Sequence, residues 1–173
     1  MGNLLFSPKG RIGPNAFLQG LGLVALLSAL IGMVPAFNFA LGSVLGYVSI
    51  FLLFPIFCLL IKRSHDAGKS GWMSIVWFII ILLIGGILGF FASHAAGGDL
   101  LKEMNEFSQS AAEEGDILAV FEIATDYAPR VAQKTAIPSS IASFAGTMIA
   151  GFLINLMVKQ ETHENQFGPV PNA

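Results

Sequence analysis

The feature that most constrains this chain is a long stretch without charge. From Ile12 to Ile61 there is not one charged residue. As a single helix this stretch would run about 75 Å at roughly 1.5 Å per residue, whereas the hydrocarbon core of a bilayer is about 30 Å thick. It therefore predicts two membrane spans with a turn between them. We place the turn at Pro35–Asn38, because proline lacks an amide donor and asparagine tolerates turn geometry.

The rest of the chain predicts two more spans. Charged residues make up only 12% of the sequence, about half the share in soluble domains. No segment outside the apolar stretches is long enough to bury a core of its own. We therefore expect an all-α polytopic membrane protein, a single membrane domain over residues 1–173 in a lipid bilayer. The four transmembrane helices are predicted at residues 16–33, 39–61 (with a kink at Pro55), 72–93 and 137–158.

Residues 94–136 form the predicted outer loop between spans three and four. This acidic segment shows apolar spacing typical of two short amphipathic helices. Asp99 is expected to cap the first helix, and Gly115 to break it. Asp116 is expected to cap the second helix, which Pro129 would end.

Within the spans, small residues recur at four-residue spacing, as in Gly85/Gly89 and Ala142/Gly146/Ala150. Such spacing favours close packing of helices in a membrane. Asn155 is a polar residue inside span four, and we expect it to form an interhelical hydrogen bond.

The orientation follows from the lysines and arginines that flank the spans, because cytoplasmic loops carry an excess of them. Six lie on the side of the two termini (Lys9, Arg11, Lys62, Arg63, Lys69 and Lys159), and three lie on the other side (Lys102, Arg130 and Lys134). The N-terminus, the loop at residues 62–72 and the tail at residues 159–173 are therefore predicted to be cytoplasmic.

The loop between spans two and three is the densest polar cluster, but it contains no complete catalytic motif. Gly68-Lys69-Ser70 resembles the end of a P-loop, yet Arg63 stands where its first glycine is needed. Ser64, His65 and Asp66 are sequence neighbours and cannot face one another as a catalytic triad. A zinc motif starting at His163 would need its second histidine at Phe167. We therefore identify no catalytic residue, metal ligand or cofactor.

Asp66 is the one carboxylate in this loop. We expect it to pair with an arginine or to cap the turn at Gly68, a structural role rather than acid–base chemistry. Gly68 and Gly71 allow a tight backbone that presents amide groups to an anion. Trp72 is expected to anchor span three at the membrane interface.

Three segments together resemble a known family. They are Gly10-Arg11-Ile12-Gly13, the run from Lys62 to Trp72, and Asn165-Gln166-Phe167-Gly168-Pro169. The chain resembles the domain of unknown function 805 family of bacterial inner-membrane proteins, over residues 6–93 and 137–171 but not 97–136. The resemblance implies a bacterial inner-membrane location without an agreed activity. Family members usually carry a second arginine where Pro14 stands here.

Because all three segments fall on the predicted cytoplasmic side, they are expected to converge, with Arg11 near Asp66 and the tail folded over the loop. The candidate binding surface comprises Arg11, Lys62, Arg63, His65, Asp66, Lys69, Ser70, Trp72 and Asn165. The sequence favours a non-enzymatic scaffold or regulatory subunit that binds a protein or an anionic lipid headgroup there. The expected partners also include further copies of the chain in a homo-oligomer, and no nucleic acid partner is expected. The alternatives are an oligomeric channel or transporter component, and an enzyme acting on a lipid or phosphate.

Overall fold

The structure is a computed structural model that describes residues 2–171, so positions 172–173 of the predicted tail lie outside the described part. Its helices are α1 (Gly2–Phe6), α2 (Pro14–Met33), the 3-10 turn η1 (Val34–Ala36), α3 (Phe39–Val48), the 3-10 turn η2 (Ser49–Leu52), α4 (Leu53–Asp66), α5 (Met73–Glu113) and α6 (Ile117–Met157). No β-strand occurs within residues 2–171.

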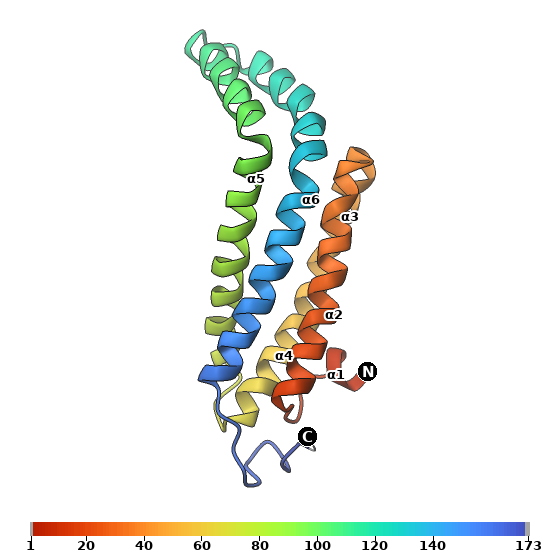
Figure 1. Ribbon diagram of the computed structural model, residues 1–173, viewed down its shortest axis with the longest axis vertical. Helices are drawn as coiled ribbons and strands as arrows, with labels where there is room; N and C mark the ends of the chain where they lie inside the picture. The colour runs from red at the N-terminus through yellow and green to blue at the C-terminus, as the bar shows by residue number, and fades with distance from the viewer. Residues whose placement is uncertain (1, 172–173) are drawn as a thin grey trace.

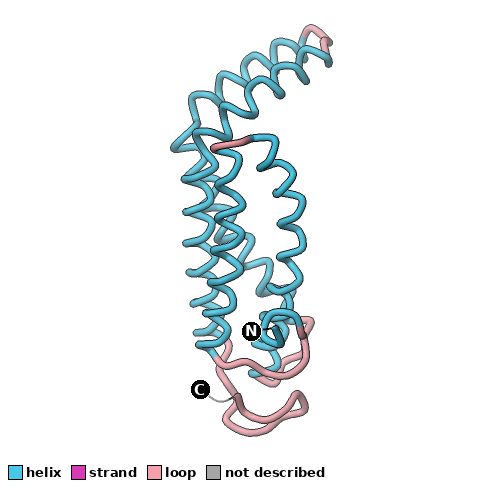
Figure 2. Tube along the Cα trace, turned by 90° about the vertical axis from the view of Figure 1, so that its right-hand side faces the viewer, coloured by secondary structure: helices cyan, strands magenta, loops and turns pink. Residues whose placement is uncertain are grey.

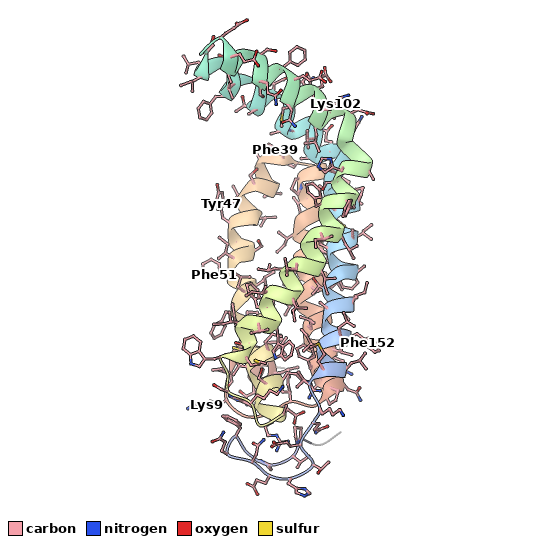
Figure 3. All side chains as sticks on the ribbon, turned by 90° about the vertical axis from the view of Figure 1, so that its left-hand side faces the viewer. Lys9, Phe39, Tyr47, Phe51, Lys102 and Phe152 are labelled. Atoms are coloured by element: carbon pink, nitrogen blue, oxygen red, sulfur yellow. The ribbon has the colours of Figure 1, made fainter. Side chains whose placement is uncertain are left out.

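Four helical stretches are long and apolar enough to cross a membrane: Pro14–Ala36, Phe39–Asp66, Met73–Glu113 and Ile117–Met157. The expected all-α polytopic fold is confirmed. The stretches run alongside one another, with both ends of the chain at the same end of the bundle (Figure 1). Tyr47, Phe51 and Phe152 project away from the bundle (Figure 3). Apolar side chains on this outer surface suit contact with lipid.

The turn between the first two spans lies where the sequence predicts it. Pro35 is part of η1, and Asn38 caps α3 by accepting a hydrogen bond of 2.9 Å from the amide of Leu41. Gly42 lies against this turn, since a Cβ there would stand 2.4 Å from Cγ of Pro35. The proline ring therefore occupies space that only a glycine leaves open.

The second span is interrupted, but not at the expected place. The break is the 3-10 turn at Ser49–Leu52, whereas the sequence predicted a kink at Pro55. Pro55 is the third residue of α4. The first four amides of a helix have no intrahelical acceptor, so a proline at this position costs no hydrogen bond. Pro55 thus stands in the first turn of a new helix, just after the break.

The predicted outer loop, residues 94–136, differs most from the prediction. It is helical, as expected, but its helices continue spans three and four as the far ends of α5 and α6 (Figure 1). The backbone leaves helical geometry at Gly97 (φ −132°, ψ 15°), and Asp99 lies within α5. Its side chain forms no capping hydrogen bond with any residue that the structure describes, so the expected cap is not seen. Beyond this point the paired helices lean to one side of the bundle (Figure 3).

The turn of this helical hairpin follows the sequence prediction. Gly115 has a φ of +76°, and the Asp116 side chain caps α6 by accepting from the amide of Ala119 at 3.0 Å. Pro129, by contrast, does not end the helix, since α6 runs through it and through Pro138. The tertiary packing of α6 on α5 overrides the local signal of these two prolines.

Small residues bring α5 and α6 together, as their spacing predicts. A Cβ on Gly146 would stand 2.7 Å from the Cα of Gly85, and one on Gly89 would stand 2.3 Å from the Ser143 hydroxyl. Such close backbone approach supplies the van der Waals contact that holds membrane helices together.

Candidate functional site

Many of the fully buried side chains lie at or near the end of the molecule that carries both termini. We call this part, formed by residues 7–13, 62–72 and 158–169, the motif end. Figure 2 shows that loops from different parts of the chain gather here below the helices. The largest fully buried side chains cluster at or next to it: Arg63, Phe17, Leu21, Leu59, Leu60, Ile154, Val158 and Asp66.

Arg11 links all three motif segments. It lies between Gly10, whose φ of +89° turns the chain, and Gly13, which precedes α2. Its Nε donates to Oδ1 of Asp66 at 3.2 Å. Its two terminal nitrogens donate to four backbone carbonyls: Asp66 at 3.2 Å, Glu161 at 2.7 Å, His163 at 2.8 Å and Gly168 at 3.3 Å. A guanidinium has five N–H donors, so the capacity of Arg11 is fully used within the protein.

Arg63 forms a second link, between α4 and α6. It is 1% exposed and donates from Nε to the side chain of Asn155 at 2.8 Å. Its terminal nitrogens donate to Oδ2 of Asp66 at 2.5 Å and to the carbonyl of Val158. Asn155 in turn donates to the carbonyl of Pro14 at 3.0 Å. The expected interhelical role of Asn155 is thus confirmed, and it joins α6 to the start of α2.

Asp66 sits between the two arginines, fully buried. Each carboxylate oxygen accepts from a different guanidinium, and the backbone carbonyl of Asp66 accepts from the amide of Glu161 at 2.9 Å. The expectation that Asp66 pairs with an arginine is confirmed. Removing one partner of a buried ion pair leaves an uncompensated charge, which is strongly destabilising. Asp66 therefore holds together the start of α2, the end of α4 and the tail.

The tail folds back over the loop between α4 and α5. Asn165 donates from its side-chain amide to the carbonyl of His65 at 3.0 Å and to Glu161 at 2.7 Å. Phe167 stacks on the imidazole of His65, with ring centroids 3.8 Å apart and an interplanar angle of 4°. The expected convergence of the three segments is therefore what the structure shows.

Lys62 has a partner that the sequence did not predict. It is 3% exposed, and its Nζ donates to the carbonyls of Asn3 and Leu4 in α1. The helix α1 is itself unforeseen; its only sequence signal is the apolar run Leu4–Phe6, of which Leu4 and Leu5 pack against the core. Lys62 therefore docks this short helix, and its ammonium does not point to the surface.

The Gly68 turn is closed by internal hydrogen bonds. The amide of Gly68 donates to the carbonyl of His65 at 3.0 Å, and the amide of Lys69 donates to the carbonyl of Ser64 at 3.0 Å. The idea that Gly68 presents its amide to an anion is therefore wrong. Gly68 has a φ of +65°, a backbone conformation that favours glycine. A Cβ there would stand 2.3 Å from the Glu161 carboxylate, so a larger residue would also displace that side chain.

The nine candidate residues thus fall into two groups. Arg11, Lys62, Arg63, Asp66 and Asn165 are engaged in contacts within the protein. Lys69, Ser70 and Trp72 are exposed, with Trp72 at 80%, and His65 is half-buried beside them. His65, Ser70 and Trp72 line a groove of about 580 Å³, and Lys69 precedes Ser70 in the loop. Only this second group can contact a ligand or partner without rearrangement of the motif end.

The family described as "Protein of unknown function (DUF805)" matches residues 5–169. The chain belongs to the DUF805 family. The match extends across residues 97–136, which we expected to lie outside the resemblance. Comparisons with curated proteins and with solved structures found no match. In this DUF805 protein, the buried cluster of Arg11, Asp66 and Arg63 gives the charged residues of the first two motif segments a structural role.

Proposed function

We propose that this chain is a non-enzymatic scaffold or regulatory subunit of the bacterial inner membrane, which binds a partner protein through the exposed part of its motif end. The observation that supports it best is the full internal use of Arg11 around a buried Asp66. Buried ion pairs and hydrogen bonds of this kind stabilise the conformation of a surface and do not act on a substrate. What it leaves exposed is a short basic and aromatic patch at Lys69, Ser70 and Trp72.

The proposed orientation places this patch in the cytoplasm. The cationic residues at the motif end outnumber those of the hairpin, which carries most of the acids. The positive-inside rule therefore supports cytoplasmic termini. The hairpin of α5 and α6 would then extend from the opposite face of the membrane.

The geometry disfavours an enzyme built on His65 and Asp66. Both oxygens of Asp66 are occupied by guanidinium groups, and the residue has no exposed surface. A general acid or base must reach within hydrogen-bond distance of its substrate. Nδ1 of His65 lies 3.2 Å from the carbonyl of Gly10, which leaves only Nε2 for another contact.

A photo-crosslinker attached at Ser70→Cys in native membranes tests the proposal, because Cys58 is buried and should not react. We expect one defined crosslinked protein, which is lost when Lys69→Glu reverses the charge of the patch. The matched control is Glu114→Cys, an exposed site at the hairpin turn. Crosslinks to abundant neighbours alone, identical from both sites, would rule out a partner at this surface.

A channel or transporter component is the second candidate, because one cavity favours it. A space of about 410 Å³ between α2, α4, α5 and α6 is lined by the hydroxyl residues Ser28, Ser139, Ser140, Ser143 and Thr147. Among the described residues, only Ser139 of this set has a hydrogen-bond partner, the carbonyl of Ala136 at 3.2 Å. Hydroxyl groups without partners at membrane depth suit a polar path. Flux of ions or small solutes into proteoliposomes, reduced by Ser143→Val, is the expected result, and absence of flux removes this candidate.

A further inference from the structure

The groove at the motif end lies between the end of α4 and the beginning of α5. His65 and Phe57 line it from α4, Ser74 and Ile75 from α5, and Gly71 from the loop between them. Phe167 of the tail also lines the groove, and its ring stacks on that of His65. The groove is therefore bounded by α4, by the loop after it, by the beginning of α5 and by the tail.

The lining changes from polar to apolar along the groove. His65 and Ser70 stand where the helices leave the bundle, whereas Phe57 lies eight residues earlier in α4, about 12 Å further into the bundle at 1.5 Å per residue. Phe57 packs on Phe78 with ring centroids 4.6 Å apart. Because Phe78 lines the hydroxyl-lined cavity, this aromatic pair separates that cavity from the groove.

Two polar atoms in the groove have no partner within residues 2–171. Ser74 is only 3% exposed, and its hydroxyl takes part in none of the hydrogen bonds among these residues. Nε2 of His65 also takes part in none of these hydrogen bonds. It faces Gly71 across the groove, since a Cβ placed on Gly71 would lie 3.5 Å from it. Both atoms are open to the groove and are not sealed inside the protein, so a ligand in the groove can form hydrogen bonds with them.

We propose that this groove binds a glycerophospholipid of the surrounding leaflet. The phosphate oxygens accept hydrogen bonds from the hydroxyls of Ser70 and Ser74. The first part of an acyl chain lies along Phe57 and Ile75. The apolar wall distinguishes this ligand from free phosphate, which has nothing to place there. The site does not depend on the partner protein proposed above.

Quenching of Trp72 fluorescence tests the proposal, because Trp72 also lines the groove and is 80% exposed. The full chain in detergent is titrated with phosphatidylglycerol brominated on its acyl chains, and Trp72→Phe supplies the background from buried Trp77. We expect saturable quenching. Ser74→Ala should raise the half-quenching concentration roughly tenfold, as loss of one hydrogen bond to a charged group predicts. Gly71→Leu should also raise it, because the new side chain fills the groove.

Three controls separate the outcomes. Gly98→Leu adds the same bulk where a Cβ meets nothing within 4 Å, and should leave quenching unchanged. A brominated fatty acid, which lacks the phosphate, should show no dependence on Ser74. Inorganic phosphate should not displace the lipid. The proposal is overturned if Ser74→Ala and Gly71→Leu, with melting temperatures equal to that of the parent, quench as the parent does, or if inorganic phosphate displaces the lipid fully.

Discussion

Oδ1 of Asp66 accepts a hydrogen bond from Nε of Arg11 across 3.2 Å, although the two residues are 55 positions apart in the chain. The side chain of Arg11 is 1% exposed and that of Asp66 is fully buried, so the pair lies out of contact with water. Arg63 approaches the other oxygen of Asp66 from the same helix. One carboxylate thus neutralises part of the charge of two buried guanidinium groups.

Asp66→Asn should destabilise the protein strongly. It leaves Arg11 and Arg63 buried without a counter-charge, and breaking a buried pair in this way costs about 3–5 kcal/mol. Thermal unfolding in detergent measures the loss. Asp126→Asn is the matched control, because Asp126 pairs with Arg130 at 3.1 Å on the surface, where both side chains are more than half exposed. Equal melting temperatures for the two variants would show that the buried pair contributes nothing.

Arg11→Lys should release the tail while the helical bundle stays folded. A lysine ammonium has three donors on one atom and cannot reach the carbonyls of Glu161, His163 and Gly168 as a guanidinium does. Limited trypsin digestion reports on this through cleavage after exposed Lys159. We expect cleavage to be roughly tenfold faster for each 1.4 kcal/mol lost. The substitution Arg130→Lys on the surface should leave the rate unchanged, and the same rate for Arg11→Lys would contradict the role assigned to Arg11.

Gly146→Ala should separate α5 from α6. Its Cβ would stand 2.7 Å from the Cα of Gly85, and backbone cannot move aside as a flexible side chain does. Gly86→Ala is the control, since a Cβ there meets nothing within 4 Å. In the control, alanine should stabilise the helix by up to about 1 kcal/mol. The two variants should therefore shift the melting temperature in opposite directions, and a stabilising Gly146→Ala would refute the close helix crossing.

The sequence predicts the membrane frame well because the signal is physical and local. A charge-free stretch as long as Ile12–Ile61 has few alternatives to two membrane-spanning helices. The turn between them is signalled locally, because the side chain of Asn38 can cap the following helix. The continuation of α6 through Pro129 has no such local signal. Across the hairpin, Tyr127 is 8% exposed and lies with its ring centroid 6.5 Å from that of Phe107. Such tertiary contacts decide the helix length.

The sequence predicts where the candidate site lies, but it does not predict the role of each residue in it. The motif segments and the topology together predict that Arg11 meets Asp66. They do not predict that Lys62 donates to the carbonyls of α1, because the short apolar run Leu4–Phe6 is too weak a signal to assign a helix there. Whether a cation such as Lys62 or Lys69 faces solvent depends on which carbonyls lie nearby, and only the three-dimensional arrangement specifies this.

The proposed orientation makes a prediction that needs no knowledge of the partner. Ser70 is an exposed residue of the connection between α4 and α5, and Glu114 is an exposed residue of the turn between α5 and α6. These two connections lie at opposite ends of the molecule (Figure 1), and each site is replaced by cysteine in turn. A membrane-impermeant maleimide added to spheroplasts, whose inner membrane is intact, should label Glu114→Cys and spare Ser70→Cys. Permeabilised cells should label both, and the unmodified chain should stay unlabelled because Cys58 is 1% exposed. Labelling of Ser70→Cys alone in intact spheroplasts would show the opposite orientation, with the motif end and its groove at the outer leaflet.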